Sequence, residues 1–82
     1  MSMGKVVKHS ATLHGHRTSF SLEDEFWDEL KHLALERRIS IASLIAQVDD
    51  ERDADSNLSS ALRVHVLRTL QGLHGQSENG ET

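Results

Sequence analysis

The segment His14–Leu30, HGHRTSFSLEDEFWDEL, changes its hydrophobic period part-way along, and this change decides the fold. Up to Leu22, polar and apolar side chains alternate, which is the period of a strand. From Glu23 onwards, apolar side chains recur every three or four residues, which is the period of a helix with one buried face. The polar side of the strand carries Arg17, Ser19 and Ser21, and the buried side of the helix carries Phe26, Leu30, Leu33 and Ala34. The sequence therefore predicts a short strand that leads directly into a helix.

This strand has no evident partner in the sequence. We place it at residues 17–22, with an alternative start as early as Ala11, where Gly15 would weaken the ladder. An unpaired strand with one buried face loses several kcal/mol in unmade backbone hydrogen bonds. A symmetric homodimer removes this cost, because each strand can pair with its own copy across a two-fold axis. We predict a mainly α fold with one short strand, in which an obligate homodimer forms an intermolecular two-stranded antiparallel ribbon.

Composition supports a small dimeric domain with an uneven charge. The 82 residues include no Cys, so neither a disulfide nor a thiolate metal site stabilises the fold. The net charge is −4, but residues 1–22 contain Lys5, Lys8 and Arg17 and no acid, so the remaining sixty residues carry −7. No apolar run resembles a membrane span or a secretory signal, so we expect a cytoplasmic protein without a membrane partner. The basic segment and the acidic body should meet different partners.

The chain divides into five predicted segments. Residues 1–10 form a flexible basic arm, residues 11–52 the strand and two helices, and residues 53–57 an acidic connector, followed by a C-terminal helix over residues 58–75 and a disordered tail over residues 76–82. The first helix spans about residues 23–37, and the second begins behind Ser40 as its N-cap. The main stripe of the last helix is Leu58, Leu62, Val66, Leu70 and Leu73. The predicted dimer core is Phe20, Leu22, Phe26, Leu30, Leu33, Leu44, Ile45 and Val48.

The outward side of the ribbon has the chemistry of a DNA reader. A two-stranded ribbon fits the major groove of B-DNA, where an arginine can bond bidentately to guanine and hydroxyls can bond to any base. We expect Arg17, Ser19 and Ser21 to contact bases. Double-stranded DNA is therefore the predicted partner.

The span RTSFSLEDEFWDELKHLALERRISIASLIAQV, residues 17–48, resembles the Arc/MetJ/CopG-like ribbon-helix-helix superfamily of bacterial and phage DNA-binding proteins. The phrases LHGHRTSFSLEDEFW and NLSSALRVHVLR are similar to a group of short alphaproteobacterial proteins of this kind, mostly uncharacterised, with an added C-terminal segment. The resemblance implies a transcriptional regulator whose ribbon reads bases and whose second helix anchors a phosphate by its N-terminal amides. The expected phosphate contacts are Arg37, Arg38, Ser40, Ile41, Ala42, Lys5, Lys8 and His16.

One position departs from the superfamily pattern. Many relatives place Gly or Asn in the turn between the helices, where the chain is left-handed, whereas this chain has Arg37 and Arg38. If Arg38 adopts that conformation, the strain is about 1 kcal/mol. Either the turn differs, or a basic residue is kept there for phosphate contact.

Other functions find less support in the sequence. The chain has no Cys nucleophile and no Gly-rich phosphate loop, so we expect no enzyme, no catalytic residues and no cofactor. The acidic run Asp49–Asp55 lacks the Gly and distal Glu of a calcium loop, and His14 and His16 lack a third ligand, so we expect no metal site. The alternative is a protein-protein interaction module, antitoxin-like or an adaptor, with a protein partner bound through Trp27, Leu35 and the C-terminal helix.

Overall fold

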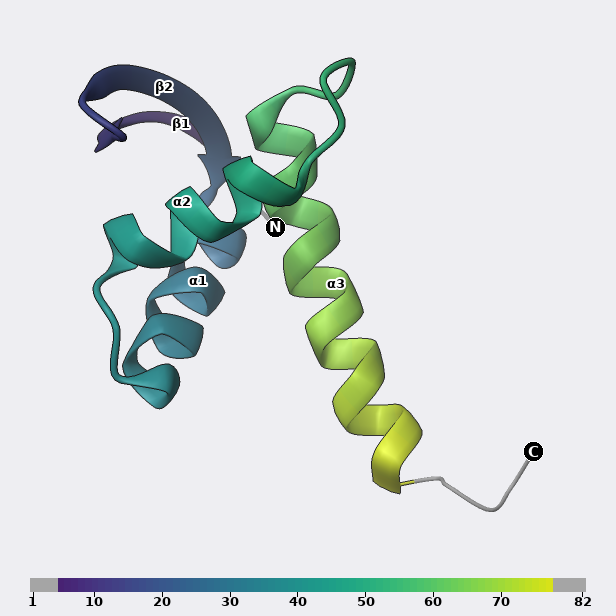
Figure 1. Cartoon of the computed structure of the whole chain (residues 1–82). Coiled ribbons are helices and arrows are strands. Elements are labelled where there is room, and N and C mark those ends of the chain that lie inside the picture. Colours follow the sequence, from purple (N-terminus) through teal and green to yellow (C-terminus); the bar gives the residue numbers. More distant parts are fainter. Residues whose placement is uncertain (1–4, 78–82) are drawn as a thin grey trace.

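The computed structural model describes residues 5–77, with side chains through Gly72. Its elements are β1 (Val6–Leu13), β2 (His16–Glu23), α1 (Asp24–Arg37), α2 (Ile41–Glu51) and α3 (Leu58–Ser77). The two strands form a hairpin beside α1 and α2, and the C-terminal half of α3 extends away from the other elements (Figure 1). No helix in residues 5–77 is long and apolar enough to cross a bilayer.

The strand β1 corrects the sequence prediction. It pairs antiparallel with β2 in a register that runs from Val6 opposite Glu23 to Leu13 opposite His16. The prediction of one short strand was therefore wrong. The prediction of a flexible arm was also wrong for residues 6–10, which belong to β1. Residues 1–4 of that arm lie outside the described residues. The ribbon forms within one chain, so β2 does not need a second copy to satisfy its backbone.

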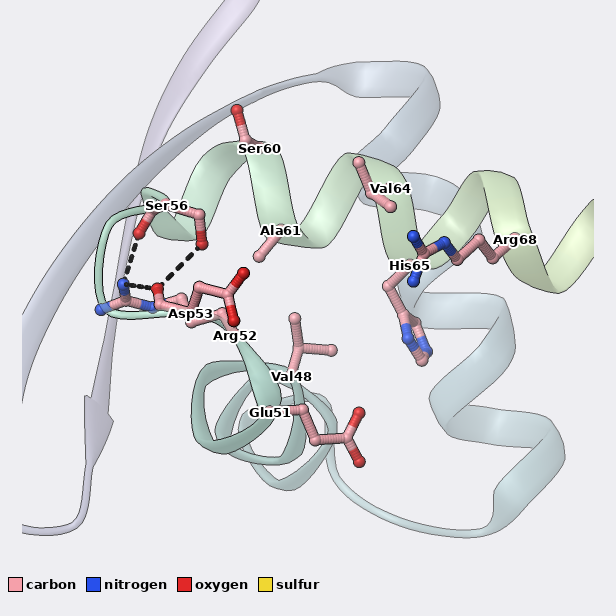
Figure 2. Close-up of a pocket in the computed structure, with 10 residues that line it drawn as sticks. All are labelled: Val48, Glu51, Arg52, Asp53, Ser56, Ser60, Ala61, Val64, His65 and Arg68. Carbon is pink, nitrogen blue, oxygen red and sulfur yellow. Dashed lines mark hydrogen bonds between the residues drawn. The ribbon is translucent and has the colours of Figure 1, made fainter.

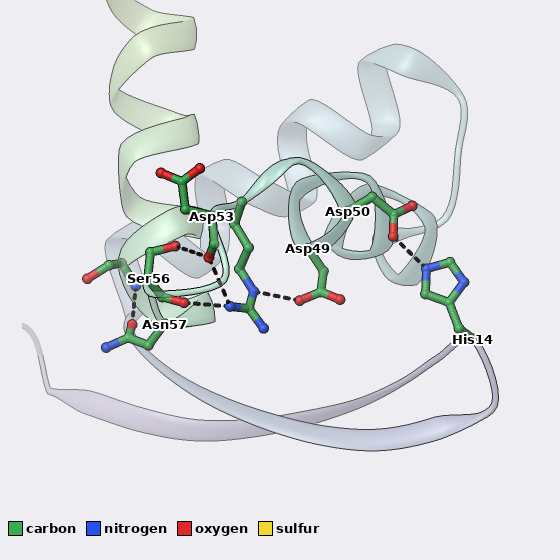
Figure 3. Close-up of polar contacts among 8 residues, drawn as sticks. His14, Asp49, Asp50, Asp53, Ser56 and Asn57 are labelled. Atoms are coloured by element: carbon green, nitrogen blue, oxygen red, sulfur yellow. Dashed lines mark hydrogen bonds and ion pairs between the residues drawn. The ribbon is translucent and has the colours of Figure 1, made fainter.

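A two-residue turn closes the hairpin. His14 and Gly15 have φ angles of 52° and 82°, and positive φ at both central residues is typical of the type I′ turn, whose twist matches that of paired strands. Gly15, which we expected to weaken a ladder, instead supplies the backbone conformation that creates one. The His14 imidazole also contacts the Asp50 carboxylate of α2 at 2.8 Å, which ties the turn to the helices (Figure 3).

The core is built from every element of the chain. Its buried side chains are Leu13, Phe20, Leu22, Leu30, Leu33, Ala34, Leu44, Ile45, Val48, Leu58, Leu62 and Val66. Of the eight residues predicted for a dimer core, seven are buried within this single chain, and Phe26 is half-buried. The hairpin and α3 supply the cover that we expected from a second copy.

The helix boundaries follow from local caps. At the end of α1, Arg38 is left-handed with φ 59° and ψ 42°, and the N–H of Ile39 donates to the Ala34 carbonyl at 3.0 Å. The chain therefore accepts the strain of about 1–2 kcal/mol that a non-glycine residue has in this conformation. The predicted N-cap of α2 is confirmed, because Ser40 Oγ accepts from the N–H of Ser43 at 3.0 Å.

Arg52 organises the connector between α2 and α3, of which Asp53, Ser56 and Asn57 are labelled in Figure 3. Its Nε donates to the Asp49 carboxylate at 2.7 Å, and its Nη1 donates to the carbonyls of Asp53 and Ser56. The first of these contacts pairs one charge of the acidic run, and the other two satisfy carbonyls that follow the end of α2. The connector is thus held by one cation rather than left as a free loop.

The last helix is longer than predicted and less completely covered. It begins behind Asn57, whose Oδ1 accepts from the N–H of Ser60 at 2.8 Å, and residues 76 and 77 are helical rather than part of a tail. Residues 78–82 lie outside the described residues. Along the predicted stripe, burial ends at Val66, since Leu70 is 36% exposed, and the Leu73 side chain lies outside the described ones.

The two residues of α1 predicted for a protein partner have different surroundings. Trp27 is half-buried, and its ring stacks on the His9 imidazole of β1 with centroids 4.0 Å apart. Leu35 is 74% exposed. Of these two residues, only Leu35 is therefore available on the surface of α1 for contact with another protein.

Candidate nucleic-acid interface

The outer face of the hairpin is polar and cationic. Alternation along the strands turns Leu13, Phe20 and Leu22 into the core and the intervening side chains outward. Three cross-strand pairs make up the middle of this face, namely Lys8 with Ser21, Ser10 with Ser19, and Thr12 with Arg17. We call these six residues the outer face. It holds two cations, four hydroxyls and no carboxylate.

Arg17 and Ser19 lie on the open part of the outer face. Both are exposed, and Arg17 Nη2 donates to Ser10 Oγ across the strands at 3.3 Å. A guanidinium has five N–H donors, and this contact uses one of them. The contact orients the Arg17 side chain along the ribbon while it leaves the other donors for an acceptor outside the chain.

Ser21 lies at the border of the outer face, where α3 meets β2. Its N–H donates to Ser59 Oγ at 2.9 Å, and its carbonyl accepts from Arg63 Nη2 at 3.4 Å. Ser21 is half-buried, unlike Arg17 and Ser19. The three predicted base-contacting residues therefore share one strand, but only two of them are fully open.

Glu23 is the acid at the end of β2, and Arg63 neutralises it. Arg63 Nε donates to Glu23 Oε1 at 2.9 Å. The hydrogen bond from Arg63, with a further backbone hydrogen bond, lowers the pKa of Glu23 below its usual range, so the carboxylate stays ionised and paired. The pairing reduces the repulsion that this acid would exert on a polyanion beside the hairpin.

A family comparison accounts for this arrangement of hairpin and helices. The model of the ribbon-helix-helix domain matches residues 6–70, which include both strands, α1, α2 and most of α3. The chain belongs to the ribbon-helix-helix domain family. Ribbon-helix-helix domains generally bind DNA, as transcription regulators or antitoxins, and they typically dimerise. Neither the curated proteins nor the solved structures contain a significant match.

In this ribbon-helix-helix chain both edges of β2 are at least partly occupied. One edge bonds to β1 along the whole strand, and on the other edge the backbone of Ser21 bonds to Ser59 and Arg63 of α3. A second copy's strand could pair fully with this edge only if α3 moved away. The intermolecular ribbon predicted from the sequence is thus replaced by pairing within the chain.

The second ribbon-helix-helix feature is the N-terminus of α2. The Ser40 hydroxyl is used within the chain, since it bonds to both the N–H and the hydroxyl of Ser43. The N–H groups of Ile41 and Ala42 precede the first intrahelical bond and have no partner among the described residues. Arg37 and Arg38, which precede α2 in the sequence, are exposed. This end of α2 therefore offers two amides to an anion.

Sequence reasoning missed two of the six residues of the outer face. Ser10 and Thr12 were not among the predicted contacts, although they face outward beside Ser19 and Arg17. The available signal for this strand was the apolar side chains Val7, Ala11 and Leu13 at alternate positions of residues 6–13, interrupted by His9, with a Gly at the turn that follows. Lys5, Lys8 and His16, predicted to contact phosphates, are all exposed.

A cavity of about 350 Å³ lies between the end of α2 and α3 (Figure 2). It is lined by Val48, Glu51, Arg52, Asp53, Ser56, Ser60, Ala61, Val64, His65 and Arg68. Because the lining mixes carboxylates with cations, it is a poorer match for DNA than the outer face. Among residues 5–77, no group of three or more His, Asp or Glu side chains is arranged to hold a metal ion.

Proposed function

We propose that this chain is a sequence-specific DNA-binding protein, a bacterial transcriptional regulator acting in the cytoplasm, which inserts its hairpin into the major groove. The observation that carries this proposal is the outer face, with Lys8, Arg17 and four hydroxyls on one side of an antiparallel ribbon. Its dimensions suit the groove, and its charge is opposite to that of DNA although the chain is acidic overall.

Each residue of the outer face has a role in the proposal. Arg17 donates to the O6 and N7 acceptors of a guanine, because its guanidinium is exposed and held along the ribbon by Ser10. Ser19 and Thr12 bond to neighbouring base edges as donors or acceptors. Ser21 contributes less, because it is half-buried beside α3.

The phosphate contacts flank the ribbon in this proposal. Lys5, Lys8 and His16 extend from the hairpin, and the N-terminus of α2 supplies the amides of Ile41 and Ala42. Helix N-termini favour anions through their free N–H groups and the helix dipole. In this proposal Arg37 and Arg38 add positive charge near the phosphates. Arg38 would then contribute a phosphate contact that a glycine in the same left-handed conformation could not make.

Fluorescence anisotropy with duplex fragments that include the promoter of the protein's own gene tests the proposal. We expect sequence-dependent binding whose logarithm falls with the logarithm of salt concentration by about 0.9 per phosphate contact. Arg17→Ala should lose about 1–3 kcal/mol of specific binding, which is about 5- to 150-fold in affinity.

Arg68→Ala is the matched control, because it removes the same side chain from an exposed position on α3. It should leave the discrimination between specific and unrelated duplexes unchanged. Equal affinity of wild type and Arg17→Ala for a defined site would refute base reading by the hairpin. Absence of binding by either protein would show that the hairpin serves only the fold.

A further inference from the structure

The cavity between the end of α2 and α3 (Figure 2) holds charges of both signs that the described part of the chain leaves unpaired. Its volume of about 350 Å³ is within the range of cavities that bind small organic molecules. Glu51, Asp53 and Arg68 line it, and their charged groups make no ion pair among the described side chains. Arg52, the other arginine of the lining, is paired with Asp49 at 2.7 Å. The cavity therefore offers two carboxylates and one guanidinium to a ligand.

Unpaired charges of opposite sign lie at different ends of the cavity. Asp53 belongs to the connector, whereas Arg68 lies on α3, about 10 Å along the helix from Ala61. Figure 2 shows Ala61 and Val64 between these two charged side chains. Val48, which is buried, lines the same space from α2. The cavity therefore suits an elongated ligand with a cationic end, an aliphatic middle and an anionic end.

The connector end of the cavity is ordered by hydrogen bonds within the chain. The Asp53 carbonyl accepts from the N–H and the hydroxyl of Ser56, each at 3.0 Å, and from Arg52 Nη1. These bonds fix the backbone at Asp53 and leave its carboxylate free. A site that is ordered before binding loses less conformational entropy when a ligand binds, so this end of the cavity is prepared for a charged group.

A second polar group without a partner lies near the Arg68 end of the cavity (Figure 2). His65 lines this cavity, and its Nε2 is buried with no hydrogen-bond partner among the described residues. Buried polar atoms are nearly always hydrogen-bonded in folded proteins, so this nitrogen points to a partner from outside the described chain. A carboxylate bound beside Arg68 would bring acceptor oxygens to the side of the cavity where His65 lies.

We propose that this cavity binds a small linear amino carboxylate, a zwitterion whose ammonium and carboxylate groups are separated by several methylene groups. The ammonium group lies beside Asp53 and Glu51, the carboxylate bonds to Arg68, and the methylene groups cover the apolar side chains between them. A simple anion would be repelled by the two carboxylates, and a simple cation would leave Arg68 unpaired. The cavity contains none of the six outer-face residues, so the proposal does not depend on DNA binding.

Isothermal titration calorimetry of the full chain tests the class of ligand. The probes are γ-aminobutyrate, δ-aminovalerate and ε-aminocaproate, and they are compared with caproate and hexylamine, which have a similar chain but only one charge. We expect an amino carboxylate to bind at one site per chain with an affinity about tenfold or more above that of either singly charged compound, because each of those leaves one end of the cavity unpaired. Equal affinity for caproate or hexylamine, or no binding by any of the three amino carboxylates, would overturn the proposal.

Two variants test which end of the cavity holds which charge. Arg68→Gln should lower the affinity for the amino carboxylate about tenfold, because it removes the only guanidinium at the anionic end of the ligand. Asp53→Asn should lower the affinity less, because Glu51 remains. Asp55→Asn is the matched control, since it makes the same change at an exposed connector residue that does not line the cavity, and it should bind like wild type.

Circular dichroism should show the helical content of the wild type in all three variants, which separates loss of the site from loss of folding. An affinity that Arg68→Gln leaves unchanged would refute the proposed site. Equal losses in Asp53→Asn and Asp55→Asn would also refute it, because the ligand would then respond to the charge of the whole connector rather than to the cavity.

Discussion

The hairpin and α3 both cover the α1–α2 pair, but they are held by different kinds of contact. The hairpin is closed by a two-residue turn, and its strands bond to each other along eight residues each. The helix α3 is placed by three buried side chains and by bonds to residues about forty positions earlier, such as Ser59 with Ser21. The hairpin is thus specified locally, whereas α3 depends on a few long-range contacts. Changes to single residues should therefore affect the two regions unequally.

The largest expected effect is at the centre of the α3 contact. Leu62 is fully buried, so Leu62→Ala should cost about 2–5 kcal/mol from lost transfer energy and the cavity left behind. Urea unfolding followed by circular dichroism measures this change. Leu35→Ala, the same deletion at an exposed position, should stay within about 0.5 kcal/mol of wild type. Comparable losses in both variants would show that α3 is not held by this side chain.

A substitution in the hairpin turn should lower the free energy of unfolding by less than Leu62→Ala does. Gly15 has a φ of 82° and free space where a Cβ would stand, so Gly15→Ala adds backbone strain of about 1–2 kcal/mol without a clash. Gly15→Asn is the matched comparison, because Asn tolerates the left-handed region better and should recover part of the loss. If alanine is as stable as glycine here, the turn does not have the conformation that closes the hairpin.

The same contrast explains what the sequence could and could not predict. The helices α1 and α2 were predictable, since Ser40 and the period of the apolar residues are local signals. The strand β1 was missed because His9 and Ala11, which face inward, are weakly apolar, and because His14-Gly15 is a less familiar hairpin turn than Asn-Gly. Once β1 was missed, β2 appeared unpaired, and the argument for an intermolecular ribbon followed from that error.

Of the candidate site, the side on which Arg17 and Ser19 lie was predictable, because strand alternation fixes which side chains share a face. Their neighbours Ser10 and Thr12 were not, because cross-strand pairs depend on register. The contact of α3 with Ser21 could not be predicted from the sequence either, because no local pattern connects residues 21 and 59.

The hydrogen bond between β2 and α3, from Ser21 to Ser59, should contribute less to the free energy of unfolding than the hairpin turn does. Ser59→Ala removes the acceptor for the N–H of Ser21, a half-buried donor, and should cost about 1 kcal/mol. Hydrogen exchange at the Ser21 amide reports the contact directly, and we expect exchange to accelerate there while Phe20, which bonds to β1, stays protected. Ser60→Ala changes the same side chain on the exposed side of α3 and should alter neither quantity. Unchanged protection at Ser21 in Ser59→Ala would mean that the joint is maintained by other contacts, such as Arg63.

The smallest effect concerns pH and a single residue of α3, His65. His65 of α3 lines the cavity in Figure 2, and its Nε2 is buried with no partner among the described residues. Burial lowers the pKa of His65 below its ordinary 6.5, as does the charge of Arg37, while Glu51 opposes the shift. Below pH 6.5 the unfolded chain therefore binds more protons at this residue than the folded chain does.

The free energy of unfolding should consequently rise with pH as it approaches 6.5 from below, and the contribution of His65 should be constant above that value. His65→Gln keeps a polar side chain of similar size without the titration, so its stability should depend less on pH in this window. The two proteins differ only at residue 65, so the difference between their urea-unfolding curves from pH 5 to 7.5 isolates the contribution of that residue. A difference that does not vary with pH would show that folding does not favour the neutral form of His65.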